Sequence, residues 1–153
     1  MSQSDEIGRS ANRDPHPEAG ANECRYLQSI HDLRHLLNGE WVWDVFVSLR
    51  SGPLQYTGIL AAIRERSLEN GWPGRNHTYL QDSTLNRTLR RLEEAELVDR
   101  LREDSFPYRT TYWLTPPAEQ LLAAAMPFVE WAEEHSGLLD RTRRRRGGGR
   151  TGL

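Results

Sequence analysis

The sequence predicts a mostly helical α+β fold: a winged helix-turn-helix with a β-hairpin wing and extra helices at its N- and C-terminal ends. Two observations lead to this prediction. Apolar residues recur at three- and four-residue spacing in five segments, as they do along the buried stripe of a helix. Between the fourth and fifth segments, two short runs of β-type composition flank a turn. The predicted order is therefore four helices, a hairpin and a final helix.

Composition divides the chain into three predicted parts. Residues 1–22 hold Ser, Asn, Asp, Pro and Gly without periodicity, which predicts a disordered N-terminal tail. Residues 23–136 carry all the periodic segments, so we expect the winged helix-turn-helix domain and its additional helices there. Residues 137–153 are rich in Arg and Gly and lack an apolar anchor, which predicts a second disordered tail.

The first three helices are predicted from apolar stripes and from the residues that end them. The first runs from about residue 23 to a stop at Asn38-Gly39, the second spans about residues 40–49, and Thr57 is a potential cap for the third. Their stripes are, in order, Tyr26, Ile30, Leu33 and Leu37; Val42, Val45, Phe46 and Leu49; and Ile59, Leu60 and Ile63.

The fourth helix follows a turn-rich stretch at residues 69–76. Asp82 or Ser83 is expected to cap it, and Leu85, Leu89 and Leu92 form its apolar stripe. The hairpin is predicted over residues 97–102 and 108–114, with the turn between them.

The last helix is predicted to start at the Thr115 cap with Pro116 in its first position, and Pro127 should kink it.

Charge and composition exclude several classes of protein. No apolar run is long enough to span a bilayer, and the first twenty residues lack the apolar core of a secretory signal. The single cysteine forms no internal disulfide, and we expect a cytoplasmic protein. No set of residues for nucleophilic or acid–base catalysis and no phosphate-binding glycine loop is present, so we predict neither an enzyme nor a cofactor.

The net charge of −2 does not by itself indicate a nucleic-acid partner, but the basic residues are unevenly distributed. All of them are arginine, and they cluster on the fourth helix, near the hairpin and in the C-terminal tail. A locally basic face on a mildly acidic body is compatible with DNA. The run at residues 141–146 is compatible with a nonspecific DNA arm or with a solubilising tail.

The exposed face of the fourth helix carries side chains that suit DNA. In the major groove, Arg pairs with guanine and Asn with adenine, while hairpin arginines suit the phosphate backbone. The alternative is an ordinary solvated helix face. The predicted DNA-binding residues are Ser83, Thr84, Asn86, Arg87, Arg90, Arg91, Arg102 and Arg109. Glu94 shares this face, but it lies near the far end of the helix and is expected to miss the DNA.

Two other groups of residues could have a functional role, and each also has a simpler interpretation. His31 and His35 have a metal-chelating spacing, but a solvated position beside the apolar stripe is favoured, so no metal is predicted. Cys24 lies at the start of the first helix, where the helix dipole favours a reactive thiolate, and it is a candidate redox thiol; an inert thiol is the default.

Five segments, in order, resemble the HxlR-type regulators over about residues 35–135. They are Asn38-Gly39-Glu40-Trp41, Gly52-Pro53-Leu54-Gln55-Tyr56, residues 89–100, Tyr112-Trp113-Leu114-Thr115-Pro116 and residues 131–135. The resemblance implies a homodimer built by the first and last helices, a recognition helix in the major groove and a wing on the flanking backbone. It also implies a transcriptional regulator, commonly a repressor, that responds to oxidants, electrophiles or small molecules.

The resemblance suggests partners and leaves alternatives open. We expect double-stranded operator DNA with palindromic half-sites, a second copy of the chain, and a small aromatic ligand. The residues expected to line a ligand pocket or the dimer interface are Trp41, Trp43, Trp113, Phe128 and Trp131. The alternative is a winged-helix module that binds protein without specific DNA binding.

Departures from the family pattern include a longer connecting segment and a differently placed cysteine. The segment at residues 64–79 is longer than the family's turn, and it could extend the third helix, contact DNA or cover a ligand site. Cys24 precedes Arg25 rather than Pro and lies earlier than the sensing cysteine of redox-responsive members.

Overall fold

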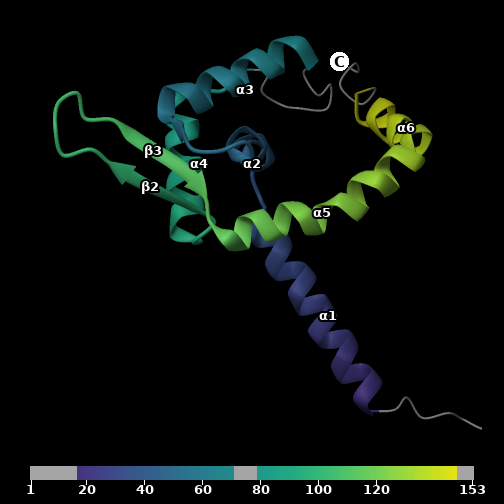
Figure 1. The fold of residues 1–153 in the computed structure, drawn as a ribbon. Coiled ribbons are helices and arrows are strands. Elements are labelled where there is room, and N and C mark those ends of the chain that lie inside the picture. The colour runs from purple at the N-terminus through teal and green to yellow at the C-terminus, as the bar shows by residue number, and fades with distance from the viewer. Residues whose placement is uncertain (1–16, 71–78, 148–153) are drawn as a thin grey trace, which may run out of the picture. The chain divides into compact units, whose positions relative to one another are not determined.

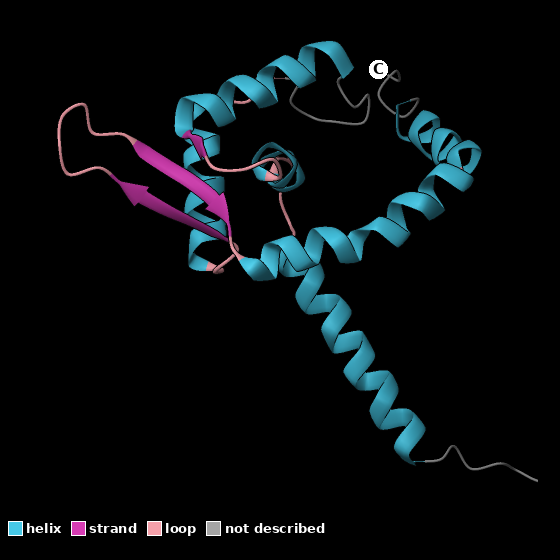
Figure 2. Cartoon of the chain, in the orientation of Figure 1, coloured by secondary structure: helices cyan, strands magenta, loops and turns pink. Residues whose placement is uncertain are grey.

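The computed structural model describes residues 17–70 and 79–147. It confirms the predicted fold class, because helices dominate and accompany one small antiparallel sheet (Figures 1 and 2). The chain divides into two compact units, one ending at Leu37 and the other beginning at Asn38, and each is described by itself. Among the described residues, no helix combines the length and apolar character that crossing a membrane requires.

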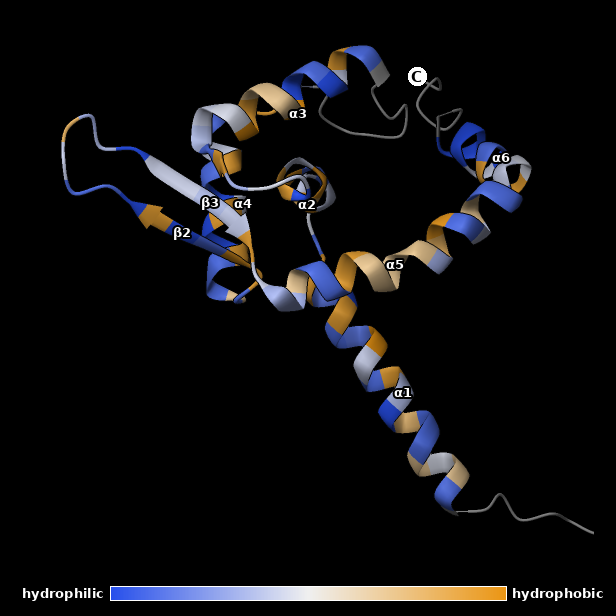
Figure 3. Ribbon diagram, viewed as in Figure 1, coloured by the Kyte–Doolittle hydropathy of each residue, from blue (hydrophilic) through white to orange (hydrophobic). Residues whose placement is uncertain are grey.

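The first unit contains one helix, α1 (Pro17–Leu36). It begins before the predicted start at Glu23, inside the stretch for which a disordered tail was predicted. Its first residues explain the difference, because a proline in the first turn, Glu18 near the positive end of the helix dipole and two alanines all favour a helix. Hydrophobic and hydrophilic residues alternate along α1 (Figure 3), and Tyr26 is 67% exposed.

The second unit is organised around α2 (Val42–Leu49), whose apolar residues are almost continuous. This helix packs against α3 (Tyr56–Asn70), α4 (Asp82–Glu94) and the sheet (Figure 1). The predicted stripes of the second, third and fourth helices are all buried. The core comprises Trp41, Val42, Val45, Phe46, Leu49, Ile59, Leu60, Ile63, Leu80, Leu85, Leu89, Leu92, Leu97, Val98, Tyr112, Leu114 and Ala118.

The sheet has three antiparallel strands in the order β1-β3-β2. The predicted hairpin is confirmed as β2 (Val98–Arg102) and β3 (Thr110–Leu114), with Val98 opposite Leu114 and Arg102 opposite Thr110. The short strand β1 (Leu54–Gln55) was not predicted, because two residues are too few to show an alternating pattern.

The length of α3 decides between the alternatives for part of the long segment that connects α3 and α4. This helix continues to Asn70, so the first of the three alternatives for the long segment holds for residues 64–70. Residues 71–78, on which the other two alternatives also depend, lie outside the described residues.

The C-terminal part consists of α5 (Pro116–Glu134) and α6 (Ser136–Gly147). Thr115 is the N-cap residue of α5, as predicted, but its hydroxyl oxygen accepts no hydrogen bond from the first turn, and the hydroxyl donates to the carbonyl oxygen of Glu96 at 2.6 Å. Pro127 lies inside α5, and the helix continues past it. α6 occupies residues for which a disordered tail was predicted; the ion pair between Arg143 and Asp140, at 3.0 Å, is one local contact that supports it.

Candidate nucleic-acid interface

The predicted DNA-reading residues lie on α4, a helix anchored by its apolar stripe. Leu85, Leu89 and Leu92 are at most 2% exposed, so the rotation of α4 about its own axis is fixed by the core. On the other side, the side chains of Ser83, Asn86, Arg87, Arg90 and Arg91 are exposed, and Thr84 is half-buried. The structure therefore presents the six predicted residues of α4 on the side of the helix opposite its buried leucines.

The start of α4 differs in detail from the prediction. Gln81, rather than Asp82 or Ser83, is the N-cap residue, and its carbonyl oxygen accepts from the backbone N–H groups of Thr84 and Leu85. Asp82 is thus the first residue of the helix, where its charge suits the helix dipole. α3 likewise begins at Tyr56, one residue before the predicted cap Thr57.

One flank of α4 lines a groove of about 460 Å³ that also contacts the start of α2. Arg91 faces this groove beside Gly39. A Cβ atom on Gly39 would lie 2.7 Å from Arg91 Nη2, so a larger residue at position 39 would require the guanidinium to shift. The groove residues are Gly39, Glu40, Trp41, Tyr79, Gln81, Thr84, Arg87, Thr88 and Arg91. The predicted DNA-binding set is thereby divided: Thr84, Arg87 and Arg91 line the groove, while Ser83, Asn86 and Arg90 do not.

The hairpin carries Arg102 and Arg109, both exposed, at the ends of its strands. The backbone N–H of Glu103 donates to the carbonyl oxygen of Arg109 at 2.8 Å, which closes the loop. Arg102 lies over the ring of Tyr108, with its Cζ 5.4 Å from the ring centroid. Phe106, at the tip, is 86% exposed and makes an edge-on contact with the same tyrosine. Both predicted arginines are thus exposed on the wing, and Arg102 lies beside exposed aromatic rings.

An ion pair connects α4 to the wing. Arg100 Nε on β2 lies 2.9 Å from Glu93 Oε1 on α4. The charge of Glu93 is the main cause of a raised pKa for Arg100, so this guanidinium stays charged under all conditions of interest. Because both side chains are substantially exposed, the pair contributes little to stability.

The five aromatic residues predicted to form a pocket or interface do not line one common pocket in the described part of a single chain. Trp41 is buried in the core, and Trp113 is half-buried on β3. Trp43 borders a separate, largely apolar groove of about 500 Å³ between α2 and α5. Phe128 is 75% exposed, and Trp131 stacks on His135 with ring centroids 4.4 Å apart.

The candidate redox and metal residues all lie on α1. Cys24 is an exposed free thiol, and His31 and His35 are exposed as well. Over residues 17–70 and 79–147, no three metal-binding side chains come together.

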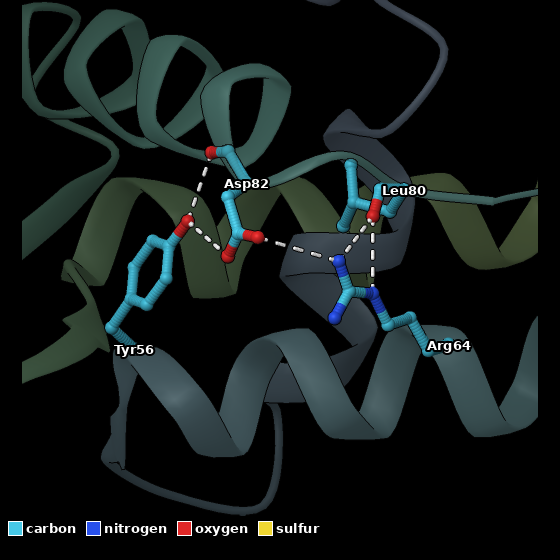
Figure 4. Close-up of polar contacts among 4 residues, drawn as sticks. All are labelled: Tyr56, Arg64, Leu80 and Asp82. Carbon is cyan, nitrogen blue, oxygen red and sulfur yellow. Dashed lines mark hydrogen bonds and ion pairs between the residues drawn. The ribbon is translucent and has the colours of Figure 1, made fainter.

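Two residues that position α4 were not predicted from the sequence. Tyr56 and Arg64 of α3 both contact the residues that begin α4 (Figure 4). Their one sequence signal is a spacing of eight, about two helical turns, which places them on the same side of α3.

The sequence and the fold were compared with known proteins. A family model described as HxlR-like helix-turn-helix matches residues 36–139. No curated protein is similar enough in sequence to count as a relative.

Several solved structures share the fold. The reduced form of the transcriptional regulator YodB from B. subtilis is 21% identical, with a TM-score of 0.56, and the match covers 70% of this chain and 91% of that one. The redox regulator HypR in its reduced form is 18% identical, with a TM-score of 0.57 and coverage of 74% and 98%. A MarR-family regulator from Enterococcus faecalis V583 is 20% identical, with a TM-score of 0.54 and coverage of 86% and 99%.

Proposed function

Because this chain belongs to the HxlR-like helix-turn-helix family, we propose that it is a transcriptional regulator that binds operator DNA as a homodimer and represses transcription. The observation that carries the proposal is the exposed face of α4, where Asn86, Arg87 and Arg90 project from a helix locked by buried leucines. A helix of this kind fits the major groove, and these side chain types pair with base edges. The family also supports a non-enzymatic, cytoplasmic role.

The remaining predicted residues take supporting roles in this proposal. Arg91 and Thr84, on the groove side of α4, contact a phosphate group, and Ser83 does so at the start of the helix. Arg102 and Arg109 of the wing contact the flanking backbone. Such contacts hold the protein in register on the DNA without reading its sequence.

The homodimer is supported by apolar surface on α5. Met126, Phe128, Val129 and Trp131 are between 43% and 75% exposed, which is costly for a helix that stays in water. A second copy would cover this surface, and a twofold dimer would place two copies of α4 on palindromic half-sites about one helical turn apart.

Regulation by a ligand or by oxidation is a further part of the proposal. The apolar groove between α2 and α5, with Trp43 on its wall, has the size and lining for a small aromatic molecule. Cys24, exposed on α1, is available to an oxidant. The arginines of α6, at residues 141 and 143–146, are suited to nonspecific contact with DNA.

The test is to select duplexes from a random DNA pool with the wild-type protein and to measure affinity for the selected sequence. Wild type should bind it at least about a thousandfold more tightly than random duplex, and log K should fall steeply with log salt. The double variant Arg87→Ala, Arg90→Ala should lose this preference, whereas the charge-matched control Arg25→Ala, Arg50→Ala should keep it. If no sequence is enriched, the proposal is wrong and the protein-binding alternative gains support.

A further inference from the structure

Two side chains of α3 converge on the start of α4 (Figure 4). The Tyr56 hydroxyl donates to the carbonyl oxygen of Asp82 at 2.9 Å and approaches its Oδ1 at 3.4 Å. Arg64 donates from Nε and Nη2 to the carbonyl oxygen of Leu80, at 3.1 and 2.9 Å. The same Nη2 lies 3.6 Å from Asp82 Oδ2. Asp82 therefore has a hydroxyl on one side and a guanidinium on the other.

Arg64 is held in this position by more than its ion pair. Its side chain is 24% exposed, whereas that of Asp82 is 66% exposed, so the cation is fixed within the protein and the anion faces solvent. The Arg64 Cζ also lies 4.3 Å from the ring centroid of Tyr79. Two hydrogen bonds to one carbonyl oxygen and an aromatic ring restrain the guanidinium, so its charge stays beside Asp82.

The position of Asp82 creates an electrostatic conflict. As the first residue of α4, its carboxylate stabilises the helix N-terminus. The same end of a recognition helix points into the DNA groove, where phosphates line both walls. An uncompensated carboxylate at this point would repel the phosphates, and it would do so most strongly at low salt.

We propose that Arg64, assisted by Tyr56, is a positioning residue for DNA recognition: it neutralises and holds the Asp82 carboxylate, so that the first turn of α4 can approach DNA phosphates. This inference rests on the proposed function. Arg64 itself contacts no DNA and acts through Asp82. The helix keeps the stabilising acidic residue in its first turn, and the DNA meets an ion pair in place of a bare anion.

A double-mutant cycle on the full chain tests the inference, with a duplex selected by wild type as the probe. Arg64→Gln should weaken binding by about tenfold at low salt, because one uncompensated charge then faces the phosphates. Asp82→Asn should change affinity by less than about threefold, because its charge is already compensated in wild type. In the Asp82→Asn background, Arg64→Gln should cost less than about threefold.

The salt dependence of DNA binding distinguishes an electrostatic role of Arg64 from a purely structural one. The loss caused by Arg64→Gln should shrink as salt rises, since charge repulsion is screened. Arg64→Lys keeps the cation but not the paired hydrogen bonds, and it should bind within about threefold of wild type. Arg64→Lys can also be used to test the inference if Arg64→Gln does not fold.

Several results would overturn the inference. One is a loss of DNA affinity on Arg64→Gln that is equal in the wild-type and Asp82→Asn backgrounds and does not depend on salt. This result would show that Arg64 acts only through Leu80. Others are an Arg64→Gln variant that binds as wild type does, and an Arg64→Lys variant as weak as Arg64→Gln. In these cases wild type still binds its selected duplex, so the proposed function stands. If wild type selects no duplex at all, both proposals fail.

Discussion

Gly39 and Arg91 illustrate how single residues shape the candidate interface. Gly39 has a φ of +151°, a backbone conformation that residues with a Cβ atom adopt at a cost. The space beside it is taken up by the guanidinium of Arg91 and by a methyl group of Val42. The turn before α2 and the groove side of α4 are therefore fitted to each other at this one position.

Gly39→Ala should lower the free energy of unfolding by about 1–3 kcal/mol, through backbone strain and close contacts. The added Cβ would lie 2.7 Å from Arg91 Nη2, which can move, and 3.0 Å from Val42 Cγ2, which is buried. Gly52→Ala is the matched control, because Gly52 has a φ of +135° but nothing within 4 Å of its added Cβ. Denaturant unfolding should show a larger loss for Gly39→Ala, and equal losses would contradict this account.

Tyr56 gives a prediction about alkaline pH. Burial is the main cause of its raised pKa, and the charge of Asp82 adds to it. Because the pKa is higher in the folded state, the protonated hydroxyl stabilises the fold. This contribution is fully present below pH 10.0, the ordinary pKa of a tyrosine, and is lost as pH rises through the pKa of the folded state. Wild type should therefore lose stability above pH 10.0 faster than Tyr56→Phe does. Parallel stability curves for the two proteins between neutral and strongly alkaline pH would argue against this linkage.

At the scale of elements, the sequence predicted those that bury an apolar stripe. The helices that contribute to the core and the hairpin were all found from periodicity, because their burial and their pattern have the same cause. The ends of the helices were harder to predict than their existence. Thr57, Asp82 and Ser83 have the side chains of good caps, yet the helices begin at Tyr56 and Asp82, two residues that hydrogen-bond to each other across 26 positions of the chain.

The exposed part of the site was predictable only as a set of residue types. Periodicity placed Asn86, Arg87 and Arg90 on the exposed face, and the structure has them there. It could not show that Arg91 lies against Gly39 or that Arg64 reaches Asp82, because such contacts depend on how separate elements pack. Long-range pairs of this kind leave no periodic signal in a single sequence.

The end of α4 gives a prediction for a whole element. Glu96 has a φ of 58° and closes the helix in a Schellman motif, in which the backbone N–H of Leu97 donates to the Leu92 carbonyl oxygen at 2.9 Å. A left-handed residue with a Cβ atom costs roughly 1 kcal/mol, so Glu96→Gly should stabilise the fold by about that amount. Glu94→Gly, within the helix, should instead destabilise it by about 0.5–1 kcal/mol. Thermal unfolding of the two variants should shift in opposite directions.

At the scale of the whole molecule, α5 carries more apolar surface than one chain covers. Its exposed apolar residues lie in the C-terminal half of the helix, and two of them, Met126 and Val129, line the groove that α5 shares with α2. The homodimer we propose would cover this surface.

The double variant Met126→Asp, Val129→Asp should shift the protein from dimer to monomer, because it places two charges in the proposed interface. Sedimentation velocity over a range of concentrations measures the shift. Gln120→Asp is the control, since it adds a charge to α5 at an exposed polar position. A double variant that stays dimeric would place the interface elsewhere, and a monomeric wild type would remove the dimer from the proposal.

The central claim, that α4 lies in the DNA major groove, is tested most directly by site-directed DNA cleavage. In a Cys24→Ser background, an iron-chelating group attached through Gln81→Cys would sit at the start of α4. We predict cuts confined to each half-site of the selected duplex, in the pattern of a major-groove reagent, and no cuts from the same group attached through Gln120→Cys on α5. Cleavage spread evenly along selected and random DNA, or stronger from position 120 than from position 81, would contradict the claim.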